Sequence, residues 1–408
     1  MAYPKVLAFI LAGGKGERLF PLTSFRSKPS VPFGGRYRIV DFVLSNFVNS
    51  QMYSIYLLVQ YKSQSLIEHV RQHWNLTSMV KDHFVAVVPP QMRMGPEWFQ
   101  GTADAVFQNI NLIKDHRCEH VVIFGADHIY RMDIRQMLDF HLANDAAVTV
   151  AARPVPIEDA SAFGVIAADS VHRITGFQEK PAEPAAMSGD PSRAYASMGN
   201  YIFRTDVLID SLVKAQRRKE HDFGANIIPG LVPTGKVFAY DFATNIIPES
   251  KPYEETGYWR DVGTISAYFS AHQDLLGEQP AFDIFNDAWP VHPSSSESPA
   301  TKILCCDINN SIIAEGSLIK GASIKNSIIR SGAMIEEGVT VEDCIISERV
   351  TLKKGVRLKR VIIDKFNTIN EREQIGYDPD KDRFRCFIDK SGIAIIPRAG
   401  RISGPFKE

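Results

Sequence analysis

The chain has 408 residues, 45% of them hydrophobic, so it is long enough to bury a sizeable core and to form two or three domains. Lysine and arginine number 46 and aspartate and glutamate number 47, which gives a formal net charge of −1. This balance provides no general basic surface. It argues against nucleic acid and anionic membranes as partners.

Neither the amino-terminal sequence nor the cysteine content suggests export. The amino terminus, MAYPKVLAFILAGG, has an apolar run too short for a secretory signal or a membrane span. The five cysteines form neither C-x-x-C pairs nor a regular framework, and their odd number is typical of a reducing compartment. We therefore expect a cytoplasmic protein. A redox switch at the adjacent Cys305 and Cys306 stays open beside the ordinary role of cysteine as a small apolar residue.

The first 275 or so residues alternate short apolar runs with amphipathic segments. The apolar runs lack polar alternation, which is typical of strands buried on both faces of a mainly parallel sheet; they lie at 6–11, 55–60, 120–127 and 146–155. Residues 63–74 and 132–145 have helical spacing, and 164–181 and 197–209 resemble strand pairs added to the sheet. The sequence thus predicts an α/β domain over residues 1–275.

An internal repeat follows a proline- and serine-rich stretch at 276–304, which is predicted to be a linker. Isoleucine pairs recur at spacings of 16, 17 and 17 residues, at Ile312/Ile313, Ile328/Ile329, Ile345/Ile346 and Ile362/Ile363. A finer step of six lies within each unit, as in Ile329, Ile335 and Val341.

This nested period predicts a three-sided parallel β-helix, because each flat side uses about six residues and points one branched aliphatic inward. We expect about four coils, with the repeats at about 311–370 inside a domain of residues 305–408, and a closing strand and turn at its end. A β-sandwich is the alternative, but its strands alternate at period two rather than six.

Three glycines directly follow the first predicted strand, in LAGGKGERL (11–19). The stretch matches neither G-x-G-x-x-G nor G-x-x-x-x-G-K-[ST]. Instead, Gly13, Gly14 and Gly16 let backbone N–H groups approach a phosphate, and basic residues follow at Lys15, Arg18, Arg26 and Lys28. The arrangement suits a triphosphate. A tight strand-to-helix turn with solvated basic residues is the alternative.

The longer string L-A-G-G-x-G-x-R-L, followed by K-P, resembles the sugar-nucleotide pyrophosphorylases, and the match narrows to the bacterial ADP-glucose pyrophosphorylase (glucose-1-phosphate adenylyltransferase) family. Its motifs occur in order along almost the whole chain: SKPSVPFGGRYRIVDFVLSNFVNS (27–50), QYKSQSL (60–66), WFQGTADAVFQN (98–109), FGADHIYRMD (124–133), SAFGV (161–165), FQEKP (177–181), SMGNYIF (197–203), HDFG (221–224) and YWRDVGT (258–264). The residues of these motifs are most similar to those of actinobacterial-type members. The resemblance implies a Rossmann-like (GT-A-like) nucleotidyltransferase domain with a mixed sheet, followed by a left-handed parallel β-helix.

The resemblance also implies the reaction: the adenylyl group of ATP passes to α-D-glucose 1-phosphate, giving ADP-glucose and pyrophosphate for glycogen or related α-glucan synthesis. Glucose 1-phosphate is mostly dianionic at neutral pH, so its oxygen can attack without a general base. The enzyme's task is then positioning and charge neutralisation, which calls for Mg²⁺ held by carboxylates.

By the family match, Asp127 and Asp261 are the metal ligands. Asp127 directly follows the predicted strand at 120–127, at the carboxyl end where open α/β sheets place ligands. Helix capping is the alternative role for Asp127, and a structural Arg–Asp pair is the alternative for Asp261.

The resemblance assigns further binding residues. Lys15, Arg18 and Lys28 are expected to face the triphosphate and, with Asp127, to be catalytic. The nucleotide is expected to contact Leu11, Ala12, Gly13, Gly14, Gly16, Gln91, Gly101 and Thr102. Glucose 1-phosphate is expected to contact Phe99, Gly164, Glu179, Lys180 and Ser197. A carboxylate suits sugar hydroxyls and an ammonium suits the phosphate, although Glu179 and Lys180 taken alone form only a charged turn before proline.

The chain departs from the family pattern around the predicted sugar site. Phe99 replaces the usual Tyr, and Gln100 stands where many members carry Arg. Ala225 and Asn226 stand where the common string has Lys and Asp. These changes leave the hydroxyl and charge contacts to the sugar open.

Regulation is a further expectation from the resemblance, because family members bind sugar-phosphate activators and nucleotide inhibitors between the two domains. Arg26, Arg38 and Arg360 match the basic residues used there, whereas Phe25 and Pro32 replace a Lys and a His of enteric-type enzymes. We therefore expect an allosteric homotetramer that is not tuned to fructose 1,6-bisphosphate.

Other functions stay open as alternatives. A non-catalytic regulatory subunit of the same fold usually loses residues around the phosphate loop or the metal aspartate, and this chain keeps Lys15, Arg18, Lys28, Asp127 and Asp261. A uridylyl or thymidylyl transferase is also open, because the residues do not settle the base preference. A bifunctional acetyltransferase fits poorly, since the predicted β-helix is short and has no evident catalytic histidine.

Overall fold

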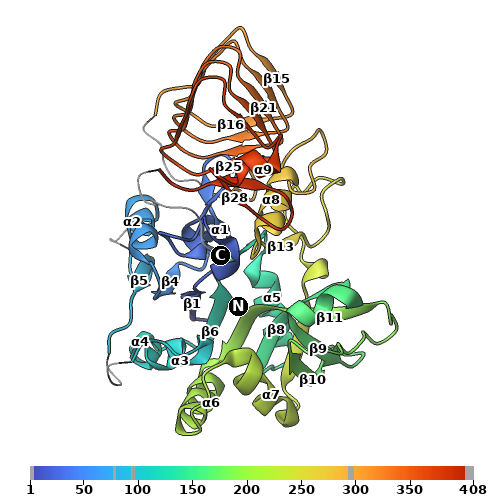
Figure 1. Ribbon diagram of the computed structural model, residues 1–408. Coiled ribbons are helices and arrows are strands. Elements are labelled where there is room, and N and C mark those ends of the chain that lie inside the picture. The colour runs from blue at the N-terminus through green and yellow to red at the C-terminus, as the bar shows by residue number, and fades with distance from the viewer. Residues whose placement is uncertain (1–3, 77–79, 93–94, 96, 293–297, 400–408) are drawn as a thin grey trace.

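The amino-terminal apolar runs form a nine-stranded mixed sheet, and the carboxy-terminal repeats form a separate stack of coils (Figure 1). The computed structural model describes residues 4–76, 80–92, 95, 97–292 and 298–399. In Figure 1 the stack lies against the side of the first domain that carries helices α1 (Ile39–Asn49) and α8 (Ile265–Gln273). Within the described residues, none of the helices combines the length and apolar character that a membrane span needs.

The nine-stranded sheet has the order β10-β9-β11-β6-β1-β4-β5, and β8 joins it through β11 and carries β12. Its parallel centre consists of β1 (Val6–Ala12), β4 (Ser54–Val59), β5 (Phe84–Val88) and β6 (His120–Gly125). The other strands are β8 (Val148–Pro156), β9 (Gly164–Ala168), β10 (Ile174–Glu179), β11 (Arg193–Arg204) and β12 (Val237–Asp241). The antiparallel strand β11 pairs with β6, β8 and β9, which makes the sheet mixed, as predicted.

Helices cover both faces of this sheet, which explains why strands such as β1 lack polar alternation. Along β1, Ala8 and Ile10 pack on one face with α1 and α5 (Ile134–Ala143), while Leu7 and Phe9 pack on the other face. The remaining helices of this domain are α2 (Gln64–His73), α3 (Thr102–Phe107), α4 (Ile110–His116), α6 (Thr205–Arg217) and α7 (Ile228–Leu231). The predicted strand pair at 197–209 is wrong in its second half, because β11 ends at Arg204 and α6 begins at Thr205.

The repeats form three parallel sheets, two with five strands and one with six. One contains β14 (Lys302–Leu304), β17 (Leu318–Lys320), β20 (Met334–Ile335), β23 (Thr351–Leu352) and β26 (Thr368–Ile369). The second contains β15 (Asp307–Asn309), β18 (Ser323–Lys325), β21 (Thr340–Glu342), β24 (Arg357–Lys359) and β27 (Gln374–Ile375). The third contains β16 (Ile312–Ile313), β19 (Ile328–Ile329), β22 (Ile345–Ile346), β25 (Val361–Ile363), β29 (Ala394–Ile396) and β28 (Phe387–Ile388). The arrangement is consistent with a left-handed β-helix, and the described coils number about five rather than the four expected.

The isoleucine pairs lie in register in the third sheet, and their two members face opposite sides. The second member of each pair, such as Ile346, packs inside the β-helix together with the six-step residues, as predicted. The first member, such as Ile345, belongs to a hydrophobic cluster that also contains Phe33 and Tyr268 of the other domain. One face of the β-helix is therefore an apolar interface, which the repeat alone did not indicate.

The closing segment adds a short hairpin to the third sheet. After α9 (Pro379–Asp382), β28 pairs antiparallel with β29, and β29 pairs parallel with β25. This agrees with the predicted closing strand and turn. Two small antiparallel pairs complete the first domain: β2 (Pro32–Phe33) with β3 (Tyr37–Arg38), and β7 (His128–Tyr130) with β13 (Trp259–Asp261).

Candidate active site

A cavity of about 860 Å³ opens at the carboxyl ends of the central parallel strands. Its walls include the last residues of β1, the turn after β6 and the end of β10. Parallel α/β sheets bind ligands at this edge, because loops from neighbouring strands converge there. The cavity is therefore the candidate active site.

Most of the predicted site residues line this one cavity: Leu11, Ala12, Gly13, Gly14, Lys15, Gly16, Arg18, Lys28, Phe99, Gly101, Thr102, Asp127, Gly164, Glu179, Lys180, Ser197 and Asp261. Gln91 does not line it. Its side chain is exposed and donates a hydrogen bond to the Pro89 carbonyl oxygen at 2.8 Å. The structure thus separates Gln91 from the other predicted nucleotide contacts.

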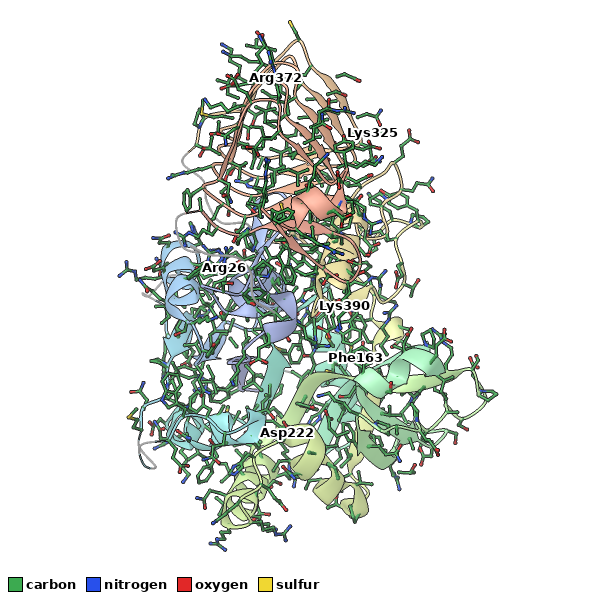
Figure 2. The ribbon with its side chains drawn as sticks, viewed as in Figure 1. Arg26, Phe163, Asp222, Lys325, Arg372 and Lys390 are labelled. Carbon is green, nitrogen blue, oxygen red and sulfur yellow. The ribbon has the colours of Figure 1, made fainter. Side chains whose placement is uncertain are left out.

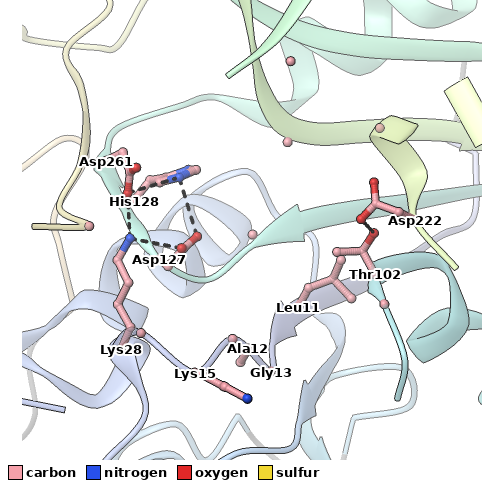
Figure 3. Close-up of a pocket in the computed structure, with 18 of the residues that line it drawn as sticks. Leu11, Ala12, Gly13, Lys15, Lys28, Thr102, Asp127, His128, Asp222 and Asp261 are labelled. Carbon is pink, nitrogen blue, oxygen red and sulfur yellow. Dashed lines mark hydrogen bonds and ion pairs between the residues drawn. The ribbon is translucent and has the colours of Figure 1, made fainter. Parts of the chain in front are cut away.

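A lysine lies between the two predicted metal ligands (Figure 3). Strand β13 pairs with β7 so that Asp261 lies opposite His128, next to Asp127. The Lys28 Nζ atom donates to Asp127 Oδ2 at 3.1 Å and to Asp261 Oδ1 at 2.6 Å. The Arg18 guanidinium lies 3.8 Å from the other oxygen of Asp261. Both carboxylates are therefore neutralised by cations of the chain itself.

The charges of this cluster support one another. Burial by itself would raise the pKa of Asp127, but the Lys28 ammonium outweighs it and holds that pKa well below its usual range. Burial would also lower the pKa of Lys28, but Asp127 and Asp261 raise it above its ordinary value. At neutral pH Asp127 is ionised and Lys28 is protonated.

The same residues have the composition of a cation site. Ligand-type atoms of Asp127, His128 and Asp261 lie within 4.8 Å of one another. The His128 Nε2 atom is 3.6 Å from Asp127 Oδ1 and 3.9 Å from Asp261 Oδ1. Carboxylate oxygens suit Mg²⁺, so the residues present fit this ion. His128 was not among the predicted residues, although it directly follows Asp127 in the sequence.

The glycine-rich loop packs closely against the stem of Lys28. Gly16 has a φ of +66°, and a Cβ there would lie 3.1 Å from Lys28 Cβ and 3.2 Å from Thr23 Cγ2. Glycine is required because it tolerates both this conformation and this close approach. Lys15 differs from Lys28: its side chain is exposed, and its Nζ lies 3.8 Å from Glu17. In Figure 3 Lys15 points away from the two aspartates.

The predicted sugar-binding residues lie on the β9–β10 side of the cavity. Glu179 ends β10 opposite Gly164, and Lys180 Nζ lies 3.2 Å from Glu179 Oε1. A Cβ on Gly164 would lie 3.0 Å from Glu179 Oε2, and a Cβ on Gly224 would lie only 2.5 Å from it. The two glycines therefore leave the space that the Glu179 carboxylate occupies.

Several lining residues were missed by the sequence prediction. The Gln60 side chain accepts a hydrogen bond from Phe99 N at 2.7 Å and donates to Phe99 O at 3.1 Å. The Asp222 carboxylate accepts a hydrogen bond from the Thr102 hydroxyl at 3.0 Å. Asp222, Tyr201 and Trp259 also line the cavity. All of these residues lie in the motifs quoted above. The signal that could have found them is that they are the other polar and aromatic residues of those motifs.

The departures from the family pattern divide into two kinds. Phe99 and Gln100 line the cavity, so their changes alter its surface. Ala225 and Asn226 are not among its lining residues. Asn226 Oδ1 accepts hydrogen bonds from the backbone N–H groups of His221 and Asp222, at 3.2 and 3.0 Å. Asn226 therefore shapes the loop that carries Asp222.

One of the predicted regulatory arginines, Arg26, joins a charged cluster where the domains meet (Figure 2 labels Arg26). Arg26 is buried and pairs with Asp364 of the β-helix domain. Arg330 of the β-helix pairs with Glu348 at 3.0 Å and donates to the Phe33 and Gly34 carbonyl oxygens at 2.9 and 2.7 Å. Burial lowers the pKa of Lys365 to about 8; Glu348 opposes the shift, and Arg26 and Arg38 add to it.

The remaining regulatory arginines have different partners. Arg38 donates from Nη1 to the carbonyl and hydroxyl oxygens of Ser65, at 2.8 and 2.9 Å. Burial lowers the pKa of Arg38, and nearby Glu348 opposes that shift. Arg360 is exposed; it donates to the Ser391 carbonyl oxygen at 3.3 Å and lies over the Phe269 ring. The charges of Arg26 and Arg38 act on Lys365 of the β-helix, and the charge of Arg330 acts on Arg38.

Comparison with known proteins identifies the family of this chain. The nucleotidyl transferase family model matches residues 7–278, and the GlmU-like C-terminal hexapeptide model matches residues 300–396. A glucose-1-phosphate adenylyltransferase from Thermodesulfovibrio yellowstonii is 66% identical over 99% of both chains. Relatives of the same description from Anaeromyxobacter sp. and Corynebacterium jeikeium are 46% and 43% identical, over 98% and 96% of this chain and 99% and 97% of their own. The chain belongs to the glucose-1-phosphate adenylyltransferase family of nucleotidyl transferases.

Proposed function

We propose that this chain transfers the adenylyl group of ATP to α-D-glucose 1-phosphate, giving ADP-glucose and pyrophosphate for glycogen or α-glucan synthesis. The observation that carries the proposal is the Lys28–Asp127–Asp261 cluster. It lies in the same cavity as the glycine-rich loop on one side and the Glu179–Lys180 pair on the other. Two phosphorylated substrates and the charges that join them can be accommodated there.

The two sides of the cavity have different tasks. At the glycine-rich loop, Gly13 and Gly14 leave backbone N–H groups uncovered for the triphosphate. Arg18 and Lys15 line the same region and offset the charge of pyrophosphate as it leaves. On the other side, Glu179 accepts hydrogen bonds from sugar hydroxyls and Lys180 pairs with the sugar phosphate.

The reaction needs no general base from the protein, because the phosphate oxygen of glucose 1-phosphate is already ionised at neutral pH. The chain's contribution is to align that oxygen with the α-phosphorus of ATP and to exclude other geometries. Asp127 and Asp261, with His128 beside them, would hold Mg²⁺. When bound, this ion supplies neutralisation of phosphate charge during the displacement.

The experiment is a measurement of pyrophosphate release from ATP, UTP or dTTP with glucose 1-phosphate and Mg²⁺. ATP is expected to be the best nucleotide, and Asp127→Asn is expected to lose almost all activity. Asp206→Asn is the matched control, because Asp206 is exposed and pairs with Arg204, two residues away. No release with ATP, or an active Asp127→Asn variant, would overturn the proposal.

The same assay separates the alternatives. A non-catalytic regulatory subunit would release no pyrophosphate when it is purified alone. Preference for UTP or dTTP would identify a uridylyl or thymidylyl transferase. The retained cluster of Lys28, Asp127 and Asp261 supports a catalytic chain rather than a regulatory one.

We further propose that phosphorylated effectors bind where Arg26 and Arg38 meet the β-helix. The support is the excess of cationic side chains there, since Arg330 and Lys365 join them around Glu348 and Asp364. Arg360 stays a predicted effector residue. Fructose 1,6-bisphosphate is expected to activate less than other sugar phosphates, and Arg38→Ala is expected to weaken every effector response. Stronger activation by the bisphosphate than by other sugar phosphates would contradict this proposal.

Three finer points stay predictions. A homotetramer and a cytoplasmic location are expected, the latter supported by five free cysteines. Actinobacterial-type membership has little support, because identity to the Corynebacterium relative is 43% against 66% for the Thermodesulfovibrio relative. Size-exclusion chromatography with light scattering would measure the oligomer.

A further inference from the structure

We propose that Lys28 is a place-holder cation, whose ammonium occupies the position between the Asp127 and Asp261 carboxylates and must leave it before a divalent cation can enter. The inference deepens the proposed function, since it rests on the metal site assigned there. It concerns a step before the chemistry, in which the chain exchanges one cation for another.

The geometry makes the two cations competitors. The Lys28 Nζ atom contacts one oxygen of each carboxylate, at 3.1 Å and 2.6 Å. The residues that would hold a metal include the same two carboxylates, and the Lys28 side chain, only 8% exposed, fills this part of the site. An ammonium and a divalent cation a few ångströms apart repel strongly in a partly buried site. The two cannot share the position.

The backbone and Cβ of Lys28 are held in place, so only the end of its side chain can move. Its Cβ lies so close to Gly16 that a Cβ on Gly16 would approach it to 3.1 Å, and its backbone begins the short 3-10 helix Lys28–Ser30, in which proline follows directly. The flexible four-carbon stem then lets the ammonium swing without a change in the backbone. Arg18 approaches the other oxygen of Asp261, so this carboxylate keeps one cationic neighbour during the exchange.

The displaced ammonium has a destination in the same cavity. Lys28 and the glycine-rich loop both line it, and the loop is where the triphosphate oxygens are expected. Entry of the metal therefore turns Lys28 from a partner of the carboxylates into a partner of the phosphates. With a metal–ATP complex, the metal charge that displaces the Lys28 ammonium and the phosphates that would receive it would come together. With a free metal ion, only the displacing charge would be present.

The first test measures Mn²⁺ binding to the full-length protein without nucleotide, from the electron paramagnetic resonance signal of free Mn²⁺ at constant pH and ionic strength. Lys28→Met, which keeps the stem and removes the charge, is expected to bind Mn²⁺ about tenfold more tightly than wild type, or better. Lys15→Met is the matched control, because Lys15 lines the same cavity but lies against Glu17; it is expected to bind within about twofold of wild type. Unchanged or weaker binding by Lys28→Met would overturn the proposal.

A second test uses wild-type protein, so it does not depend on the folding of a variant. Lysines are reductively methylated under limiting reagent and the modified sites are quantified by mass spectrometry. Saturating Mn²⁺ is expected to raise the labelling of Lys28 several-fold and to leave Lys15 unchanged. Continued protection of Lys28 in saturating Mn²⁺ would overturn the proposal. Neither test measures turnover, so failure here is distinct from failure of the adenylyl-transfer assay.

Discussion

Two clusters of cations and carboxylates in this molecule use the same chemistry in opposite surroundings. In the cavity, the side chains of Asp127 and Asp261 are 40% and 23% exposed. Between the domains, those of Arg26 and Asp364 are 3% and 2% exposed. The two partly exposed carboxylates can exchange partners with arriving phosphates and metal, whereas the sealed Arg26–Asp364 pair joins two segments of the chain.

The difference teaches that burial, rather than residue type, decides what such a cluster does. A buried pair has already lost its water, so removing one partner leaves a charge with nothing to replace it. A partly exposed pair can replace a lost partner with solvent at small cost to stability. Substitutions in the sealed cluster should therefore affect folding, and substitutions in the open cluster should affect turnover.

The largest effect on stability is expected from Asp364→Ala. It leaves Arg26 buried without its carboxylate, and Arg26 Nη1 already has no hydrogen-bond partner among the described residues. Denaturant unfolding of the full chain should show a loss of about 3–5 kcal/mol.

Two variants test the cause of that loss. Asp378→Ala removes an exposed carboxylate that pairs with Lys381 and caps α9, and it should cost much less. The double variant Arg26→Met, Asp364→Leu should recover much of the stability, because apolar side chains of similar size need no partner. A cost for Asp364→Ala no greater than for Asp378→Ala would contradict the comparison.

The open cluster is expected to respond in the opposite way. Asp261→Asn removes a charge that faces the reacting phosphates, so kcat for ADP-glucose formation should fall by about 10²–10³-fold, a typical loss for one group of a preorganised electrostatic site. Its free energy of unfolding should change by about 1 kcal/mol or less, since Lys28 keeps Asp127 as a partner. Asp145→Asn, in an exposed pair with Lys236, should change neither quantity. If Asp261→Asn were destabilised but kept a normal kcat, this cluster would serve stability rather than turnover.

The fold was largely predictable from the sequence, because the signals for it are local. The apolar runs at 6–11 and 120–127 became β1 and β6, and the six-step isoleucines became the interior of the β-helix. Each signal depends only on whether neighbouring side chains face a core. The same local reasoning failed at Thr205, where a strand pattern continued into a helix.

The site was predictable where a motif carried the chemistry and not where distant segments had to meet. Nothing in the sequence placed Lys28 between Asp127 and Asp261, because that contact depends on the pairing of β13 with β7. The position of Gln91 outside the cavity was unpredictable for the same reason. The charges of Lys365 and Arg26 meet only because the β-helix packs on the first domain.

That packing gives a smaller, paired prediction. Ile345→Val and Ile346→Val each remove one buried methyl group, from the domain interface and from the β-helix interior respectively. Both should reduce the free energy of unfolding by about 0.5–1.5 kcal/mol. Met334→Leu, at a half-exposed position of the same coil stack, should have almost no effect. If Ile345→Val behaved like the Met334 variant, the apolar contact between the domains would not contribute to stability.

The smallest effect concerns the pH dependence of the sealed cluster. Burial lowers the pKa of Lys365 from 10.5 to about 8, so the folded protein releases this proton at a lower pH than the unfolded chain does. Between these values the unfolded state binds more protons, and stability rises with pH through the contribution of Lys365. The free energy of unfolding of wild type, relative to either Lys365→Met or Lys365→Arg, should therefore increase from pH 7 to 9.5. Neither reference side chain titrates in that range. If this difference in the free energy of unfolding stayed flat or fell with pH, Lys365 would be solvated in the folded protein. Part of the interface between the domains would then be open to solvent, as the cavity is.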